Sequence, residues 1–187
     1  MREIEVKVEV RDADAARARL GAAGAVARTP RYFEDNRVYD DESRSLERSG
    51  RLLRLRSIGN RHILTLKETP DPEEGAERYK VRLEHETTVG DPHEADRILR
   101  SLGFLVAYRY QKYRQSYRLG EVTVELDETP LGVFLELEGQ PVDIDAAAER
   151  LGFGPSDYIT KTYRMLHRER SRSETPGDLV FEDRPPA

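Results

Sequence analysis

The sequence predicts an α+β protein in which eight antiparallel strands close into a β-barrel and helices pack on its outer surface. The first indication is residues 3–10, which read EIEVKVEV. This strict alternation places every charged residue on one face of a strand and every apolar residue on the other. The second is that the same alternation returns in strand after strand. The third is that the expected helices carry apolar stripes that suit the apolar side of such a sheet.

The composition fits one compact domain. The chain has 187 residues, of which 37% are hydrophobic and 36% are charged. Its apolar residues are periodic rather than sparse, so we expect an ordered fold. The formal net charge is −5, without the basic excess typical of proteins that bind nucleic acids. We therefore expect no nucleic-acid partner.

Other features of the composition bear on chemistry and location. The chain has no cysteine, which excludes disulfides and thiolate metal sites. No apolar run approaches membrane-spanning length, and the first residues lack the apolar core of a signal peptide. We expect a soluble, cytoplasmic protein with no membrane partner, present as a monomer or homodimer.

The first half of the chain is expected to alternate strands with helices. Asp12 is a favourable N-cap for a helix ending near Leu20, and Gly59-Asn60 suits the turn of a hairpin. The expected elements are a strand at 3–10, a helix from 12 to 20, a strand at 32–39, a short helix around 41–48, and strands at 51–56 and 62–67.

The second half repeats this arrangement. Asp91-Pro92 supplies an N-cap and an N1 proline for a helix that Gly103 ends. We also expect helices capped by Asp143 and starting at Asp157, the latter running through residue 166. The expected strands are 78–89, 104–118, 121–128 and 133–138. The domain is expected to cover residues 1–166, followed by a polar, loosely packed tail at 167–187.

The order of elements indicates an internal repeat. Strand, helix, strand, glycine-led strand and final strand occur once in residues 3–67 and again in residues 80–138. Charges change sign between the copies, with Arg54, Arg56 and Lys67 in the first matched by Glu125, Asp127 and Glu138 in the second. We expect two halves of one sheet, with a basic wall facing an acidic wall.

The charged faces are expected to point into the barrel, because helices must cover the apolar faces. Buried ions need partners. Arg and Lys suit phosphate oxygens, and clustered carboxylates without Cys or paired His suit Mg²⁺ or Mn²⁺. Such a site has the composition that phosphoryl transfer needs. The alternative is an exposed sheet face with cross-strand ion pairs.

Charged motifs follow one another along the successive strands. They are Glu3-x-Glu5-x-Lys7, Arg54-x-Arg56, Lys67 after Leu-Thr-Leu, Arg82-x-Glu84-x-Glu86, Lys112-x-Arg114, Glu125-x-Asp127 and Glu136-x-Glu138. In this order they resemble the CYTH superfamily, the triphosphate tunnel metalloenzymes, whose ExExK signature matches the first motif. The resemblance covers about residues 1–166. It implies an eight-stranded antiparallel tunnel that binds a triphosphate along its axis.

The resemblance also implies roles for individual residues. The implied metal ligands are Glu3, Glu5, Glu136 and Glu138, with Glu125 and Asp127 adding to the acidic wall. The implied triphosphate-binding residues are Lys7, Arg54, Arg56, Lys67, Arg82, Lys112 and Arg114. The implied metal is Mg²⁺ or Mn²⁺, and the implied partner is a small molecule containing a triphosphate.

Tyr39 and Lys67 match a Tyr-Lys pair that is linked to the attacking water in hydrolytic members of the family. The alternative is that Tyr39, at a strand end, is a packing residue. The sequence departs from the family at the next residues, because Asp41-Glu42 stands where Thr-Pro is often found. Tyr163 resembles part of the family's C-terminal helix, which can close one tunnel mouth.

Three functions are expected in order of preference. The first is a metal-dependent phosphohydrolase of tripolyphosphate or of a nucleoside or thiamine triphosphate. The second is a class IV adenylate cyclase that converts ATP to cyclic AMP and pyrophosphate. The third is a polyphosphate- or nucleotide-binding module without catalysis. The sequence does not separate hydrolase from cyclase, because both use the same metal and cations.

Overall fold

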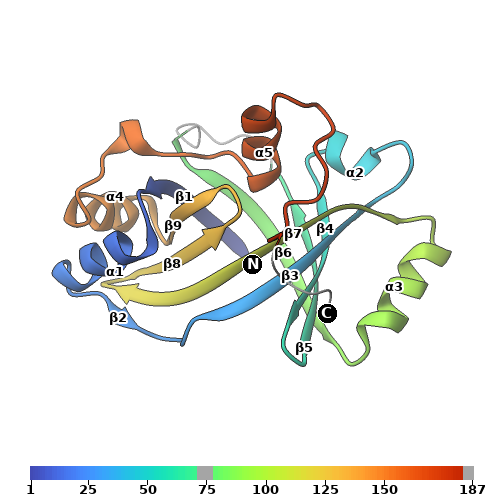
Figure 1. Cartoon of the computed structure of the whole chain (residues 1–187), viewed down its shortest axis with the longest axis horizontal. Helices are drawn as coiled ribbons and strands as arrows, with labels where there is room; N and C mark the ends of the chain where they lie inside the picture. Colours follow the sequence, from blue (N-terminus) through green and yellow to red (C-terminus); the bar gives the residue numbers. More distant parts are fainter. Residues whose placement is uncertain (71–77, 183–187) are drawn as a thin grey trace.

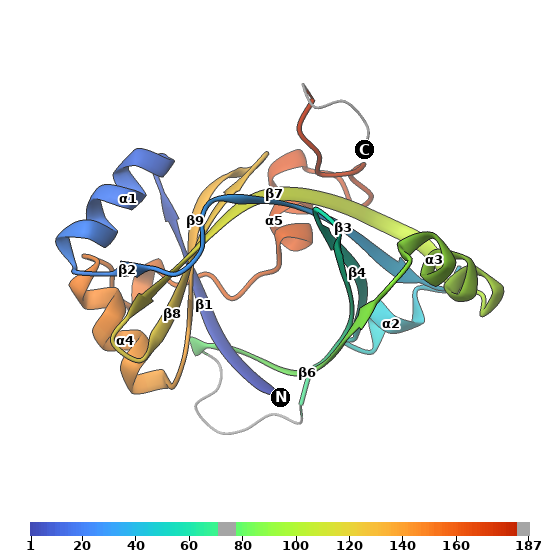
Figure 2. The same ribbon diagram turned by 90° about the horizontal axis from the view of Figure 1, so that it is seen from below.

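Eight strands form a closed antiparallel barrel in the computed structural model, which describes residues 1–70 and 78–182. Figure 2 shows the molecule viewed through this ring of strands. The order around the ring is β7 (Leu105–Leu119), β3 (Tyr32–Asp40), β4 (Leu52–Ile58), β5 (Arg61–Glu68), β6 (Lys80–Val89), β1 (Arg2–Val10), β9 (Gly132–Glu138) and β8 (Val122–Thr129). Pairing of β8 with β7 closes the ring. The predicted fold class is confirmed.

The strand order has the two-fold symmetry that an internal repeat predicts. Exchanging β1, β3, β4 and β5 for β6, β7, β8 and β9 leaves every strand of the ring with equivalent neighbours. The halves interlock, because β1 lies between β6 and β9 while β6 lies between β5 and β1. The short strand β2 (Val26–Ala27), which the sequence analysis missed, pairs with β7 outside the ring.

One hydrophobic layer lies between the barrel and two helices, α1 (Ala13–Ala22) and α4 (Pro141–Arg150). Figure 1 shows both helices beside β1, β8 and β9. Val6 of β1 packs in this layer with Leu20 of α1 and Ile144 of α4, and all three are fully buried. The apolar faces of these strands therefore point outward, which turns their charged faces into the barrel.

A second layer lies under α3 (Pro92–Ser101), on the opposite side in Figure 1. Leu99 of α3 packs there with Tyr39 of β3 and Leu55 of β4. The four-residue helix α2 (Ser45–Arg48) follows β3. Among the described residues, no helix has the length and apolar character needed to cross a membrane.

Two predicted helix starts are wrong. α4 begins at Pro141, two residues before Asp143, because the fixed φ of proline suits the first helical position. Asp157 ends a 3₁₀ turn, and its carboxylate accepts a hydrogen bond from the amide of residue 154. The last helix, α5 (Tyr163–Ser171), instead starts after Thr162, whose side chain caps it.

The C-terminal segment attaches to the barrel at two strand edges. Ile159 exchanges backbone hydrogen bonds of 3.0 and 2.8 Å with Lys7 of β1. Leu179 bonds Arg109 and Gln111 of β7, each at 2.9 Å. Leu179 is buried, so the expected loose packing of the tail does not hold there. In Figure 1, α5 lies over one end of the barrel.

Candidate active site

The charged side chains of the strands converge in the barrel interior. Less than one-tenth of the surface is exposed for Glu5, Lys7, Lys112, Asp127 and Glu136, which come from β1, β7, β8 and β9. Their apolar neighbours along the strands face the helix-covered layer instead. The alternative of a solvent-exposed charged face is therefore wrong.

Carboxylates near the start of β1 hold lysines from three strands. Nζ of Lys67 lies 2.6 Å from Glu3. Nζ of Lys7 lies 2.9 Å from Glu5, and Nζ of Lys80 lies 2.5 Å from Glu5. Burial opposes ionisation of Glu5, but Lys7 and Lys80 outweigh it and hold its pKa well below the ordinary range. Glu5 therefore stays ionised.

Asp127 is the centre of a second network. It is fully buried and accepts hydrogen bonds from Lys112 at 2.8 Å, from Arg114 at 2.6 Å and from the hydroxyl of Tyr163 at 2.8 Å. Arg114 also pairs with Glu136. Four donor contacts reach the two oxygens of Asp127. Asp127 is therefore the counter-ion of Lys112 and Arg114 in this structure, and its expected part in metal binding stays a prediction.

Glu138 differs from the other interior carboxylates. It forms no ion pair within residues 1–70 and 78–182. Burial and the charges of Glu3, Glu5 and Glu84 raise its pKa to about 7. It also lines a surface pocket of about 390 Å³. The carboxylates around Glu138 therefore carry excess negative charge beside a pocket on the protein surface.

The carboxylates around Glu138 fit a hard divalent cation by their donor chemistry. Oxygen ligands suit Mg²⁺ and Mn²⁺, and a bound cation would relieve the repulsion that raises the pKa of Glu138. In the described part of the chain, however, no three carboxylates already surround a common point as a formed metal centre. The charges of Glu3 and Glu5 act on Glu138, and the expected metal-binding role of these residues and of Glu136 stays a prediction.

Two arginines of β4 extend from the opposite wall. Nη1 of Arg54 lies 3.1 Å from the hydroxyl oxygen of Tyr110, and its Nη2 lies 3.8 Å from Glu84. Nη1 of Arg56 lies 3.8 Å from Glu34. The contacts with carboxylates exceed hydrogen-bond length. Both guanidinium groups therefore have donor capacity left for an anion.

Two predicted site residues are held by side-chain hydroxyls. Arg82 donates a hydrogen bond of 2.7 Å to Thr69. Glu125 accepts a hydrogen bond of 2.6 Å from Ser116, and its carboxylate lies 3.9 Å from Arg114. Both stay candidates for the roles that the sequence predicts, at the margin of the two networks.

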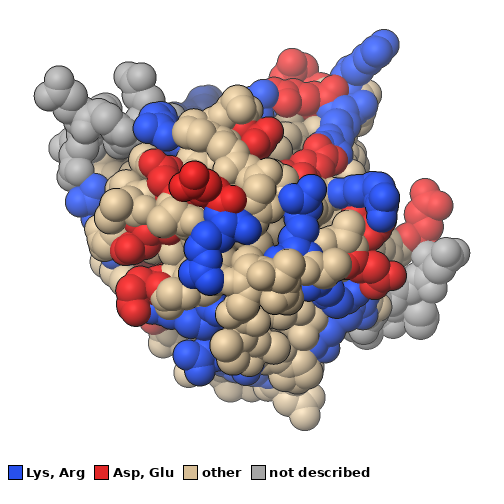
Figure 3. Space-filling model, turned by 90° about the vertical axis from the view of Figure 1, so that its left-hand side faces the viewer, with Lys and Arg blue, Asp and Glu red and all other residues tan. Residues whose placement is uncertain are grey.

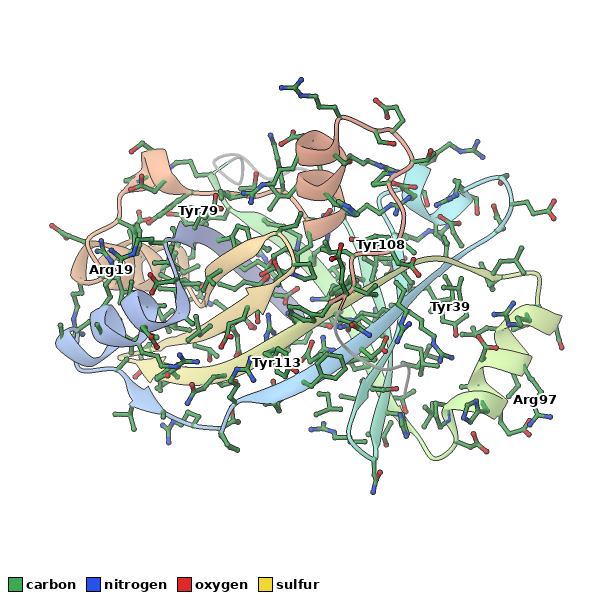
Figure 4. The ribbon with its side chains drawn as sticks, in the orientation of Figure 1. Arg19, Tyr39, Tyr79, Arg97, Tyr108 and Tyr113 are labelled. Carbon is green, nitrogen blue, oxygen red and sulfur yellow. The ribbon has the colours of Figure 1, made fainter. Side chains whose placement is uncertain are left out.

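Tyr39 points away from the interior. Its hydroxyl donates a hydrogen bond of 2.6 Å to Asp96 of α3, and its ring packs in the layer under that helix. Figure 4 labels Tyr39 on this side of the barrel. The pairing of β3 with β7 shifts register between Val38 and Tyr39. The structure does not bring Tyr39 and Lys67 together, and Tyr39 has the packing role that was the alternative.

The interior contains residues that the sequence analysis did not assign to the site. Lys80 lies two residues before Arg82 in β6, so the alternation of the strand already indicated that both share the inward face. Tyr110 shares the inward face of Lys112, two residues along β7. Tyr163 enters from α5, so no strand pattern predicts its contact with Asp127. These residues are Glu34, Lys80, Tyr110 and Tyr163.

Charges of both signs are interspersed on the outer face that carries α1 and α4, as Figure 3 shows. Several of them form exposed ion pairs, such as the contact of 2.7 Å between Arg118 and Glu121. Such pairs contribute little to stability. The concentration of paired charge in the interior is therefore the feature that bears on function.

Comparison with known proteins agrees with this geometry. A family model described as the CYTH domain matches residues 1–163. A putative adenylate cyclase from Vibrio parahaemolyticus has 21% identity and a TM-score of 0.71, covering 88% of this chain and 96% of its own. A protein from Pyrococcus horikoshii OT3 has 29% identity and a TM-score of 0.70, covering 88% and 98%.

A third structure comes from Hippeastrum and is described as a putative adenylyl cyclase with a dominant triphosphatase activity. It has 19% identity and a TM-score of 0.63, covering 93% of this chain and 98% of its own. No curated protein sequence matches the chain. The structural likenesses show a shared barrel fold.

Proposed function

The chain belongs to the CYTH domain family, and we propose that it is a divalent-metal-dependent enzyme that hydrolyses a triphosphate. The substrate class is inorganic tripolyphosphate or a nucleoside or thiamine triphosphate. The observation that carries this proposal is the paired charge in the interior, where each group of cations faces a group of carboxylates. The cations would bind the negative charge of a triphosphate, and the carboxylates would bind the positive charge of a metal ion.

The ion pairs explain why both ligands are required. A triphosphate entering alone would draw Lys7 and Arg114 from Glu136, and would leave that carboxylate buried without a partner. A metal entering alone would leave the cations unpaired in the same way. Buried unpaired charge is costly, whereas metal and triphosphate together preserve the charge balance. We therefore expect the two ligands to bind cooperatively.

The carboxylates of Glu3, Glu5 and Glu138 would hold Mg²⁺ or Mn²⁺. When bound there, the ion would neutralise phosphate charge and act as a Lewis acid at a phosphoryl oxygen. Lys112 and Arg114 would bind phosphate oxygens from the other wall, with Arg giving a bidentate contact. Lys67, beside Glu3, would donate hydrogen bonds to the reacting phosphoryl group.

Cyclisation of ATP is the second candidate, favoured by the structural neighbour from Vibrio parahaemolyticus, which is described as a putative adenylate cyclase. Hydrolysis takes precedence because the Hippeastrum neighbour is described by its dominant triphosphatase activity. A metal-free binding module is less suited to these residues. Carboxylates beside bound phosphate repel it unless a cation lies between them.

One substrate screen tests the proposal. The protein is incubated with tripolyphosphate, thiamine triphosphate or ATP, each with Mg²⁺, Mn²⁺ or EDTA, and phosphate, pyrophosphate and cyclic AMP are resolved. We expect metal-dependent release of phosphate. Cyclic AMP with pyrophosphate would establish the cyclase instead, and no turnover with any metal would refute the enzyme proposal.

Two arginine variants make the screen specific to the barrel interior. Arg114→Ala removes a buried cation that contacts Asp127 and Glu136. Arg97→Ala removes an exposed arginine of α3 that pairs only with Glu94 in the described residues. Turnover should be lost in the first variant and kept in the second. Equal activity of the two variants would contradict an interior site.

A further inference from the structure

Two polar residues of β3 are buried in the interior without hydrogen bonds. Glu34 and Asn36 lie two residues apart, so they share the inward face of the strand, and both are fully buried. Neither oxygen of Glu34 and neither amide atom of Asn36 has a hydrogen-bond partner among the described residues. Orphaned buried groups of this kind are costly and call for an explanation.

The surroundings of Glu34 are cationic. Glu34 lies opposite Lys112 in the pairing of β3 with β7, and Asn36 lies opposite Arg56 of β4 and Tyr110 of β7. Oxygens of Glu34 are 3.8 Å from Nζ of Lys112 and 3.8 Å from Nη1 of Arg56. These distances are too long for hydrogen bonds. The cations shield the carboxylate without satisfying it.

Glu34 is ionised in this environment. Burial raises its pKa, but Lys112, Arg56, Arg114 and Arg54 outweigh burial and lower the pKa to about 2. A carboxylate with this pKa accepts hydrogen bonds but holds a proton poorly. This carboxylate therefore suits the acceptance of a hydrogen bond better than the storage of a proton.

The position excludes two kinds of ligand for Glu34. A phosphate oxygen would be repelled by the carboxylate, although the neighbouring cations suit it. A metal ion would be repelled by the cations of Lys112, Arg54, Arg56 and Arg114. An uncharged O–H group is repelled by neither. Its hydrogen suits a Glu34 oxygen, and its oxygen suits the amide hydrogens of Asn36.

We propose that Glu34, together with Asn36, orients the O–H nucleophile that attacks the triphosphate. This inference rests on the proposed function. When a phosphate chain binds, Lys112 and Arg56 gain phosphate oxygens as partners, and the oxygens of Glu34, which have no hydrogen-bond partner among the described residues, accept from the nucleophile beside it. An oriented nucleophile is the part of a phosphoryl-transfer site that cations and metal do not supply.

The step is the same for either source of the hydroxyl. In hydrolysis, the water oxygen bonds to the terminal phosphorus while the bond from that phosphorus to the bridging oxygen breaks. The electron pair leaves with pyrophosphate, or with the diphosphate product, and the proton of water passes to a product phosphate or to solvent. In cyclisation, a ribose hydroxyl bonds to the α-phosphorus, pyrophosphate leaves, and the hydroxyl proton goes to solvent.

The test compares three variants in steady-state turnover of tripolyphosphate and of ATP. Glu34→Gln removes the acceptor charge, and Glu34→Asp keeps the charge but withdraws the carboxylate by one methylene. Glu94→Gln is the control, since Glu94 is an exposed carboxylate of α3 that lies 2.7 Å from Arg97, outside the barrel. We expect kcat to fall about 100-fold or more in both Glu34 variants and to change little in the control.

Affinity for tripolyphosphate distinguishes a Glu34 that orients the nucleophile from a Glu34 that is only a counter-ion of Lys112 and Arg56. Affinity for tripolyphosphate in EDTA, measured by calorimetry, should be unchanged or tighter in Glu34→Gln, because a negative charge is removed beside the cations. Weaker binding with unchanged kcat would overturn the proposal and assign Glu34 to holding Lys112 and Arg56. Full activity of Glu34→Asp would also overturn it, because orientation requires the position of the carboxylate as well as its charge.

Thermal unfolding verifies that each variant is folded. If Glu34→Gln does not fold, the turnover of Glu34→Asp still decides the question. Reactions in ¹⁸O-labelled water identify the nucleophile, because only hydrolysis places the label in phosphate. No turnover by the wild-type protein would refute the proposed function and this inference with it. An active wild type with unaffected Glu34 variants would refute this inference alone.

Discussion

Replacing Glu138 by glutamine should stabilise the metal-free protein at neutral and alkaline pH. Burial and the carboxylates of Glu3, Glu5 and Glu84 raise the pKa of Glu138 from 4.5 to about 7. The folded state therefore binds a proton that the unfolded chain has already released at pH 6. Stability then falls as pH rises from 4.5 to 7, and the full cost is present above pH 7. Glutamine carries no such cost.

The magnitude follows from the interval between the two pKa values. Each pH unit is worth about 1.4 kcal/mol, so the interval sets an upper limit of ~3.5 kcal/mol. Glu138 is partly exposed, and solvent screening reduces this to ~1–2 kcal/mol. For a protein of this size, that corresponds to a rise in the melting temperature of about 4 °C. At pH 4, wild type and variant should melt together, because Glu138 is then protonated in both states.

Calorimetric melting in EDTA at pH 4, 6 and 8 measures the effect. Glu121→Gln is the matched control, since Glu121 is 79% exposed in its side chain and lines the same pocket. It should not show the same pH-dependent gain. Saturating Mg²⁺ should reverse the order, because the wild type gains a ligand contact that Glu138→Gln lacks. A gain that is equal at pH 4 and pH 8 would refute the assigned electrostatic cause.

Three further predictions address individual contacts. Glu5→Gln should abolish metal-dependent turnover, while calorimetry should show that metal-free binding of tripolyphosphate persists or tightens. Arg114→Ala should weaken that binding about 10- to 100-fold. Equal, mild effects of the two variants would contradict the assignment of Glu5 to the metal and of Arg114 to the triphosphate. Tyr39→Phe should keep kcat within a few-fold, because its hydroxyl binds Asp96 outside the barrel; a 100-fold loss in the turnover assay would restore Tyr39 to catalysis. Tyr163→Phe should destabilise the protein by ~1–2 kcal/mol in thermal unfolding, because a buried hydrogen bond to a carboxylate is lost; an unchanged melting temperature would show that the bond is dispensable.

The barrel and its charged interior could be predicted because both follow from a local rule. A strand exposes alternate residues on opposite faces, so EIEVKVEV already separates Glu5 and Lys7 from Val6. The apolar faces then need helices, and the repeat of this pattern predicts two matching halves. The structure confirms the inward convergence of these charges and the two-fold strand order.

Contacts between distant segments were beyond this rule. Tyr39 faces α3 where the pairing of β3 shifts register, a feature that depends on the neighbouring strand and not on Tyr39 itself. Tyr163 reaches Asp127 from a helix that starts later than the sequence indicates. Asp127 was expected in the acidic wall, and its donors come from two separate elements, β7 and α5.

The sequence by itself determined the strands, the face on which each charge lies and the family resemblance, because alternation and spacing are properties of short segments. Only the tertiary structure decided which charges neutralise one another and which stay unpaired. Lys112 pairs with Asp127, whereas the carboxylates of Glu3 and Glu5 repel that of Glu138. Glu34 has no hydrogen bond to a described residue. Coulombic energy and desolvation depend on distance and burial in three dimensions, and the closure of the barrel sets both.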